Sequence, residues 1–175
     1  MKKQLTTLGI LGVILAGCSA SASAAPVEAH KAIVKTNPDF MSVVKQRAIE
    51  QRMAGVITKL KARIGKTWYV FSGATPQGWD CSGLTMWAYE QLGIELPHSA
   101  NKQAQAGIKV ASPRIGDLVL FGYPGTNTYF HASIYIGNNK VIHAGFRKGQ
   151  TTSILDLDSA SVKNTKMKFV RVGVQ

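Results

Sequence analysis

Cysteine is scarce in this chain of 175 residues, which contains only Cys18 and Cys81. We expect Cys18 to be acylated or removed with an N-terminal signal, so that Cys81 has no intramolecular partner. The sequence therefore excludes an intramolecular disulfide. For any single cysteine a buried apolar position is the commoner case. A lone exposed thiol outside the cytosol is nevertheless a liability unless its chemistry is used.

A hydrophobic run long enough to cross a membrane is also missing. The apolar run at residues 8–17 follows Lys2 and Lys3 and is too short for a transmembrane helix, so it reads as a secretory signal. Leu-Ala-Gly-Cys at residues 15–18 resembles the bacterial lipobox, which would make Cys18 the lipidated first residue. Ala-Ser-Ala at residues 22–24 instead resembles an ordinary cleavage site. We favour the lipobox, and both alternatives predict an exported protein, membrane-anchored or secreted.

Acidic residues are few, because 9 aspartates and glutamates face 21 lysines and arginines, for a net charge of +12. Without Lys2 and Lys3 the balance is 19 to 9, or +10. An exported protein of this charge is drawn to anionic wall polymers and lipid surfaces. No basic run is interleaved with aromatic residues, so we expect no nucleic acid as a partner.

The chain divides into a predicted signal peptide (1–17), a tether rich in alanine and serine (18–36) and one domain (37–175). Asn37, Pro38 and Asp39 are typical of a helix start, and we expect this helix to end near Gly65. Apolar residues recur along it at three- and four-residue steps. They are Phe40, Val43, Val44, Met53, Val56, Ile57, Leu60 and Ile64.

A second helix is predicted to open at Cys81 and to end at Gly93, with Leu84, Trp87, Ala88 and Leu92 on one face. Beyond Pro97 the pattern changes to strands, at residues 115–121, 131–136, 140–144 and 167–172. The middle two form a hairpin through Gly-Asn-Asn at 137–139. Helices followed by strands indicate an α+β fold in which N-terminal helices pack on a central antiparallel sheet.

Cys81 has a position that suits a nucleophile. At the start of a helix, unpaired backbone N–H groups and the helix dipole lower the pKa of a thiol and can hold an oxyanion. Asp80 is the predicted N-cap, and Gly83 leaves room where another element or the substrate comes close.

A nucleophile also needs a base, and the chain has four histidines. His30 falls in the tether, His98 in a loop, and His131 and His143 on the two arms of the predicted hairpin. A single histidine is most often a structural or surface residue. A pair on paired strands can be tested by register.

A three-residue loop would pair Ile136 with Lys140 and Ser133 with His143, which puts His131 diagonally beside His143 on one face. A two-residue loop would send the two imidazoles to opposite faces. The first register builds a site in which His131 takes the thiol proton and His143 orients His131. Ala132, Ile134 and Ile136 would then pack in the core.

Four blocks of sequence together resemble the NlpC-type, papain-like family of cell-wall cysteine peptidases. They are Asp-Cys-Ser-Gly-Leu at 80–84, Gly-Asp-Leu-Val at 116–119, His-Ala-Ser-Ile-Tyr-Ile-Gly at 131–137 and Val-Ile-His-Ala at 141–144. The resemblance runs from about residue 63 to 172. It implies a papain-like fold that acts without a cofactor, as a monomer.

The resemblance also implies a catalytic set of Cys81, His131 and His143 that cuts the γ-D-glutamyl bond to a diamino acid in the peptidoglycan stem peptide, through a thioester. Tyr69 matches a family tyrosine twelve residues before the cysteine, although an aromatic core residue is an equal alternative. We assign substrate contacts to Asp80, Ser82 and His98. His98 stands where the family has an arginine, and Ser-Gly at 72–73 replaces a common Gly-Gly, which leaves the exact peptide open.

Other functions have less support. No His-Glu-x-x-His motif occurs, and no third ligand of standard spacing accompanies the histidine pair, so we expect no metal. An acyltransferase or amidase would use the same thioester. The main alternative is a catalytically weak lipoprotein of the same fold that binds the wall.

Overall fold

The computed structural model describes residues 38–173, with side chains from Phe40 onward. All of them belong to the unit formed by residues 37–175. The predicted signal peptide, Cys18, the tether, His30 and the cap at Asn37 lie outside the described residues. None of the described helices is long and apolar enough to cross a membrane.

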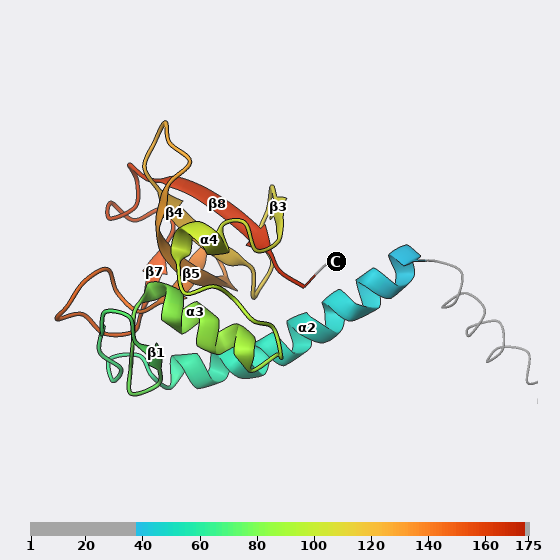
Figure 1. The fold of residues 1–175 in the computed structure, drawn as a ribbon, viewed down its shortest axis with the longest axis horizontal. Helices are drawn as coiled ribbons and strands as arrows, with labels where there is room; N and C mark the ends of the chain where they lie inside the picture. Colours follow the sequence, from blue (N-terminus) through green and yellow to red (C-terminus); the bar gives the residue numbers. More distant parts are fainter. Residues whose placement is uncertain (1–37, 174–175) are drawn as a thin grey trace, which may run out of the picture. The chain divides into compact units, whose positions relative to one another are not determined.

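The first described helix, α2, runs from Pro38 to Lys61. Its second half packs in the core, where Val56 and Leu60 are buried, whereas Val43 and Val44 in the first half are exposed. The predicted apolar face is therefore only half used, because the first turns of α2 extend past the sheet (Figure 1). The α-helix also ends earlier than we predicted, and the chain continues in turns that include Gly65.

Helix α3 spans Cys81–Glu90 and has the predicted N-cap, since the side chain of Asp80 accepts a hydrogen bond from N of Gly83. Leu84, Ala88 and Tyr89 bury its inner face. The end differs slightly from the prediction, because Gln91 is the C-cap, two residues before Gly93. A short helix that we did not predict, α4 (Ala100–Gln103), follows Ser99, whose side chain accepts from N of Lys102.

Six antiparallel strands form the sheet, in the order β3-β8-β4-β5-β6-β7. The four predicted strands correspond to β4 (Leu118–Gly122), β5 (Tyr129–Gly137), β6 (Lys140–His143) and β8 (Lys166–Arg171). The edge strands β3 (Ile108–Val110) and β7 (Ser153–Asp156) were not predicted. Neither was the small pair β1 (Ala74–Thr75) and β2 (Gly78–Trp79). The prediction of an α+β fold with a central antiparallel sheet is confirmed.

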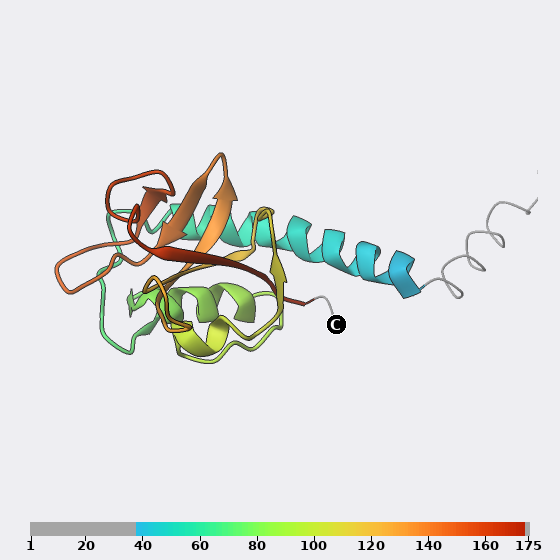
Figure 2. The ribbon, with the colours of Figure 1, turned by 90° about the horizontal axis from the view of Figure 1, so that it is seen from above.

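The two faces of the sheet have different coverings (Figure 2). Leu118, Ala132, Ile134 and Ile142 belong to the larger core cluster, together with the buried residues of α2 and α3. A smaller cluster, which includes Phe121, lies on the other face. Because alternate residues of a strand share a face, His131, Ser133 and Tyr135 of β5 belong to the side of the smaller cluster.

The hairpin of β5 and β6 has the predicted register, but its turn differs from the predicted one. Ile134 pairs with Ile142, as we predicted, whereas Lys140 pairs with Gly137 and not with Ile136. Asn138 and Asn139 both have positive φ, as a two-residue type I′ turn requires. A bulge at Ile136 then shifts the ladder by one residue, which has the same effect as a three-residue loop.

Candidate active site

Cys81 is the first residue of α3, and its neighbours hold that helix start in place. Oδ1 of Asp80 accepts hydrogen bonds from N of Gly83, at 2.7 Å, and from Oγ of Ser82, at 3.0 Å. A Cβ on Gly83 would lie 1.9 Å from O of Gly73. The glycine is thus needed because the loop before β1 crosses directly over this turn of α3.

Sγ of Cys81 meets strand β5 where the strand extends past the end of β6. Its hydrogen bond is to O of Phe130, 4.0 Å away, and the N–H of Ala132 also acts on the thiol. Phe130 forms a bulge, because Phe121 pairs with His131 while Gly122 pairs with Tyr129. The thiol therefore contacts the backbone on both sides of His131.

The pKa of Cys81 is raised, contrary to our expectation for a helix start. Burial is the largest cause, and the charge of Asp80 adds to it. The backbone N–H groups of Ala132, Ser82 and Cys81 lower the pKa, as we expected, but their combined effect is smaller. The side chain of Cys81 is therefore a neutral thiol at rest.

His131 and His143 come together as the hairpin register predicted. Nε2 of His131 lies 3.0 Å from Nδ1 of His143, and the two rings meet edge to face at 88°. Burial, with His143 nearby, holds the pKa of His131 well below its usual 6.5. Burial also lowers the pKa of His143 to about 4. Both imidazoles are therefore neutral near pH 7.

One prediction about this geometry was wrong. The histidines do not lie on the sheet face that α3 covers, because Ala132 and Ile134 supply the apolar surface there and His131 points to the other side. That Sγ of Cys81 lies within about hydrogen-bond reach of a ring nitrogen of His131 stays a prediction; the hydrogen bond that the thiol makes goes to the Phe130 carbonyl. Ala132 and Ile134 are fully buried, as predicted.

Phe146 and Ser153 complete the surroundings of the histidines, and sequence reasoning missed both. The ring of Phe146 stacks on His131 with a centroid distance of 4.3 Å and meets His143 at 5.0 Å. Oγ of Ser153 lies 3.1 Å from Nε2 of His143. Phe146 comes two residues after the predicted strand at 140–144, whereas the short strand β7 that carries Ser153 has no strong apolar pattern.

A cavity of about 380 Å³ adjoins the thiol, and all the predicted substrate contacts line it together with Tyr69. Burial, and then the charges of Cys81 and Asp80, raise the pKa of Tyr69, so that its phenol stays a donor. Ser82 and Asp80 form part of the wall. His98 also lines the cavity, and its Nε2 lies 3.0 Å from each carboxylate oxygen of Asp80.

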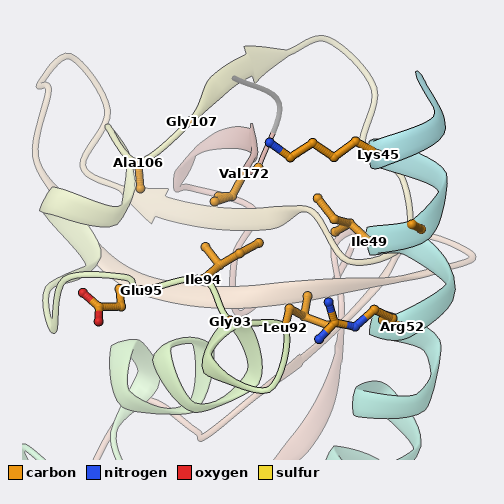
Figure 3. A pocket seen from close by; sticks show the side chains of 12 residues that line it. Lys45, Ile49, Arg52, Leu92, Gly93, Ile94, Glu95, Ala106, Gly107 and Val172 are labelled. Atoms are coloured by element: carbon orange, nitrogen blue, oxygen red, sulfur yellow. The ribbon is translucent and has the colours of Figure 1, made fainter. Parts of the chain in front are cut away.

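Two further pockets differ in their relation to the thiol. One of about 490 Å³ is lined by His143, Phe146 and Ser153 and lies on the far side of the histidine pair. Another of about 520 Å³ lies between the middle of α2 and the chain after α3, with Lys45, Ile49 and other side chains on its wall (Figure 3). The second shares no lining residue with the cavity at Cys81.

No three His, Cys, Asp or Glu side chains of residues 38–173 lie close enough together to hold a metal ion.

Comparison with known proteins places this arrangement in a family. The sequence model of the NlpC/P60 family matches residues 65–171. "Murein DD-endopeptidase MepS/Murein LD-carboxypeptidase" of Escherichia coli is 31% identical over 157 residues, which are 83% of this chain and 80% of that protein. "Gamma-DL-glutamyl hydrolase" of Bacillus subtilis is 41% identical over 104 residues, or 57% of this chain and 25% of that protein.

Other relatives are longer than this chain. It is 40% identical over 94 residues to the "Probable endopeptidase" of Mycobacterium tuberculosis and spans 23% of that protein's length. Among solved structures, the NlpC/p60 domain of the peptidoglycan hydrolase SagA superposes with a TM-score of 0.57 at 29% identity, covering 68% of this chain and 98% of that domain. With a family match over most of the folded part and a relative of similar length, this chain belongs to the NlpC/P60 family.

Proposed function

We propose that this chain is a cysteine peptidase that cuts the stem peptide of peptidoglycan at the γ-D-glutamyl bond to a diamino acid. The observation that carries the proposal is the thiol of Cys81, which lines a cavity of about 380 Å³ and contacts the backbone on both sides of His131. Two relatives support the substrate, since one is named a murein endopeptidase and the other a gamma-DL-glutamyl hydrolase.

The reaction starts from a neutral pair, because burial raises the pKa of Cys81 and lowers that of His131. Nε2 of His131 is engaged with His143, so Nδ1 is the nitrogen that takes the thiol proton. Proton transfer accompanies attack of Sγ on the amide carbonyl carbon, and the carbonyl electron pair moves to oxygen. Catalytic hydrogen bonds often tighten only when substrate binds.

Collapse of the tetrahedral intermediate breaks the C–N bond. The leaving nitrogen takes the proton from His131, and the acyl group remains on Sγ as a thioester. Water then attacks the thioester carbonyl while His131 accepts its proton, and that proton returns to sulfur when the C–S bond breaks. The N–H groups at the start of α3 and the phenol of Tyr69 stabilise the oxyanion.

Digestion of purified muropeptides, followed by mass spectrometry, tests the proposal. The protein should release products cut after D-glutamate, and Cys81→Ala should release none while still binding purified walls. Val43→Ala, an exposed position on α2, serves as the matched control and should keep full activity. If Cys81→Ala cuts as fast as the wild type, the peptidase proposal is wrong. If the wild type and Cys81→Ala are both inactive but bind walls equally, the chain is a wall-binding protein of the same fold.

We also propose that Cys18 is the lipidated first residue of an exported, membrane-anchored protein. The support is the tetrapeptide at residues 15–18 and the charge of +10 that remains without Lys2 and Lys3 (19 − 9), which favours anionic surfaces. In cells, the wild type should fractionate with membranes, and Cys18→Ala should be released or mislocalised. A soluble form without residues 1–24, which lacks position 18, should cut muropeptides at the same rate as the full-length protein, because the anchor takes no part in catalysis. Peptide mapping that finds a mature N-terminus at Ala25 would overturn the lipid anchor.

A further inference from the structure

Three neighbouring strands carry one chain of hydrogen-bonding side chains. His131 lies on β5, His143 on β6 and Ser153 on β7, and these strands are adjacent in the sheet. Ser153 is directly opposite His143 in the β6–β7 ladder. Nε2 of His131 lies 3.0 Å from Nδ1 of His143, and Nε2 of His143 lies 3.1 Å from Oγ of Ser153.

Resting on the peptidase function proposed above, we infer that Ser153 is a positioning residue that accepts a hydrogen bond from His143 and thereby favours the tautomer in which both histidines carry hydrogen on Nε2. Ser153 contacts neither the thiol nor the cavity beside it. Its effect on the reaction passes through His143.

Two directions of hydrogen bonding are available to the resting chain, because each neutral imidazole has one N–H. In the first, His131 donates from Nε2 to His143, which donates from Nε2 to Ser153, and Nδ1 of His131 is left with a lone pair. In the second, the Ser153 hydroxyl donates to His143, which donates from Nδ1 to His131. Nδ1 of His131 then carries the hydrogen and cannot accept the thiol proton.

The protonated state that forms during the reaction removes the second direction. Once His131 has taken the thiol proton, both of its nitrogens carry hydrogen, and Nε2 must donate to Nδ1 of His143. His143 must then carry its hydrogen on Nε2, where Oγ of Ser153 is its acceptor. The serine is therefore needed as an acceptor at the step in which His131 is charged.

The surroundings of Ser153 suit this role. Its side chain is half-buried at the edge strand and lines the pocket of about 490 Å³ beside His143. The hydroxyl hydrogen can point into that pocket while the oxygen accepts from the ring. His143 is 4% exposed, so an Nε2–H that loses this acceptor has little access to solvent, and an unpaired buried donor is costly.

Three substitutions at Ser153 test the inference by kinetics on purified muropeptides. Ser153→Ala should lower kcat roughly tenfold with KM little changed, because the lost acceptor matters mainly when His131 is charged. Ser153→Thr keeps the hydroxyl and should restore kcat. Ser153→Asp offers an oxygen that can only accept, and should also keep kcat above that of the alanine variant. Ser161→Ala, in the same pocket, is the matched control and should equal the wild type.

Long-range ¹H–¹⁵N NMR of the ring nitrogens gives a readout that a merely structural role would not move. In the wild type and the threonine variant, His131 and His143 should both carry hydrogen on Nε2, whereas Ser153→Ala should show a mixture of tautomers. Unchanged tautomers together with wild-type kcat in Ser153→Ala would overturn the inference and leave the peptidase proposal standing. Activity in Cys81→Ala would instead overturn the peptidase proposal, while the NMR result would still decide the tautomers.

Discussion

Nε2 of His98 lies 3.0 Å from each carboxylate oxygen of Asp80, the residue that caps the helix of the thiol. Asp80 also accepts hydrogen bonds from Ser72, Ser82 and Gly83. The carboxylate is thus held by four groups, of which His98 alone comes from the segment between α3 and α4. His98 closes one wall of the cavity by contacting the helix cap.

Removing His98 should affect binding more than folding. We expect His98→Ala to raise KM severalfold while the melting temperature changes by less than about 2 °C, because Asp80 keeps three other hydrogen bonds. His98→Arg should preserve KM, since a guanidinium can pair with both carboxylate oxygens. Steady-state kinetics and thermal unfolding of the two variants check this. Equal KM in all three proteins would show that this wall does not contact substrate.

The dependence of kcat/KM on pH should show no titration at the usual pKa of a histidine. Burial holds the pKa of His131 well below 6.5, so kcat/KM should stay level when pH falls from roughly 8 to 6. Burial raises the pKa of the Cys81 thiol, so alkylation by iodoacetamide should be slow at neutral pH and accelerate as the solution becomes alkaline. An acid limb of kcat/KM centred near pH 6.5 would contradict this assignment.

Stability should fall as the solution becomes acidic. The pKa of His143 is lowered to about 4 in the folded state from 6.5 when unfolded, so between these values the unfolded chain binds more protons. The contribution of His143 to the free energy of unfolding is therefore fully present above pH 6.5. It is lost as the pH falls toward 4, and the loss amounts to roughly 3 kcal/mol. Urea unfolding at several pH values measures it. His143→Asn should show a decline smaller by about that amount, and an identical decline would contradict the prediction.

Two glycines in helices should respond oppositely to alanine. In Gly83→Ala the new Cβ would lie 1.9 Å from the Gly73 carbonyl oxygen, and backbone must move. We expect a loss of roughly 2 kcal/mol or more, with lower activity because Cys81 shifts. Gly55→Ala on α2, where nothing lies within 4 Å, should instead stabilise by up to about 1 kcal/mol. Denaturant unfolding of both variants provides the comparison, and equal effects would contradict it.

A matched pair of valines on α2 tests which half of the helix is packed. Val56 is 4% exposed and Val43 is 48% exposed. Val56→Ala should lower the free energy of unfolding by roughly 2 kcal/mol, because it removes buried methyl groups and leaves a cavity. Val43→Ala should change it by less than about 0.5 kcal/mol. A large loss for Val43→Ala would mean that the first turns of α2 are covered in solution.

Periodicity and cap residues were enough to predict the main elements. The cap at Asp80 and the apolar steps from Leu84 predicted α3, and four strands followed from alternating apolar residues. The edge strands were missed because they are short and half-exposed. Ser153–Asp156 alternates between intermediate and exposed residues, with no run that a core would demand. Ser153 therefore could not be placed beside His143 from the sequence.

The sequence by itself determined the family, the α+β fold and the residues that register could bring together, because motifs, caps and strand alternation act over short distances along the chain. The hairpin illustrates the limit, since Gly-Asn-Asn permits two turns, and only the bulge at Ile136 decided the register. The tertiary structure decided which sheet face α3 covers, the contact of Phe146 with His131, and the raised pKa of Cys81. These depend on burial by segments far apart in the chain, which no local pattern specifies.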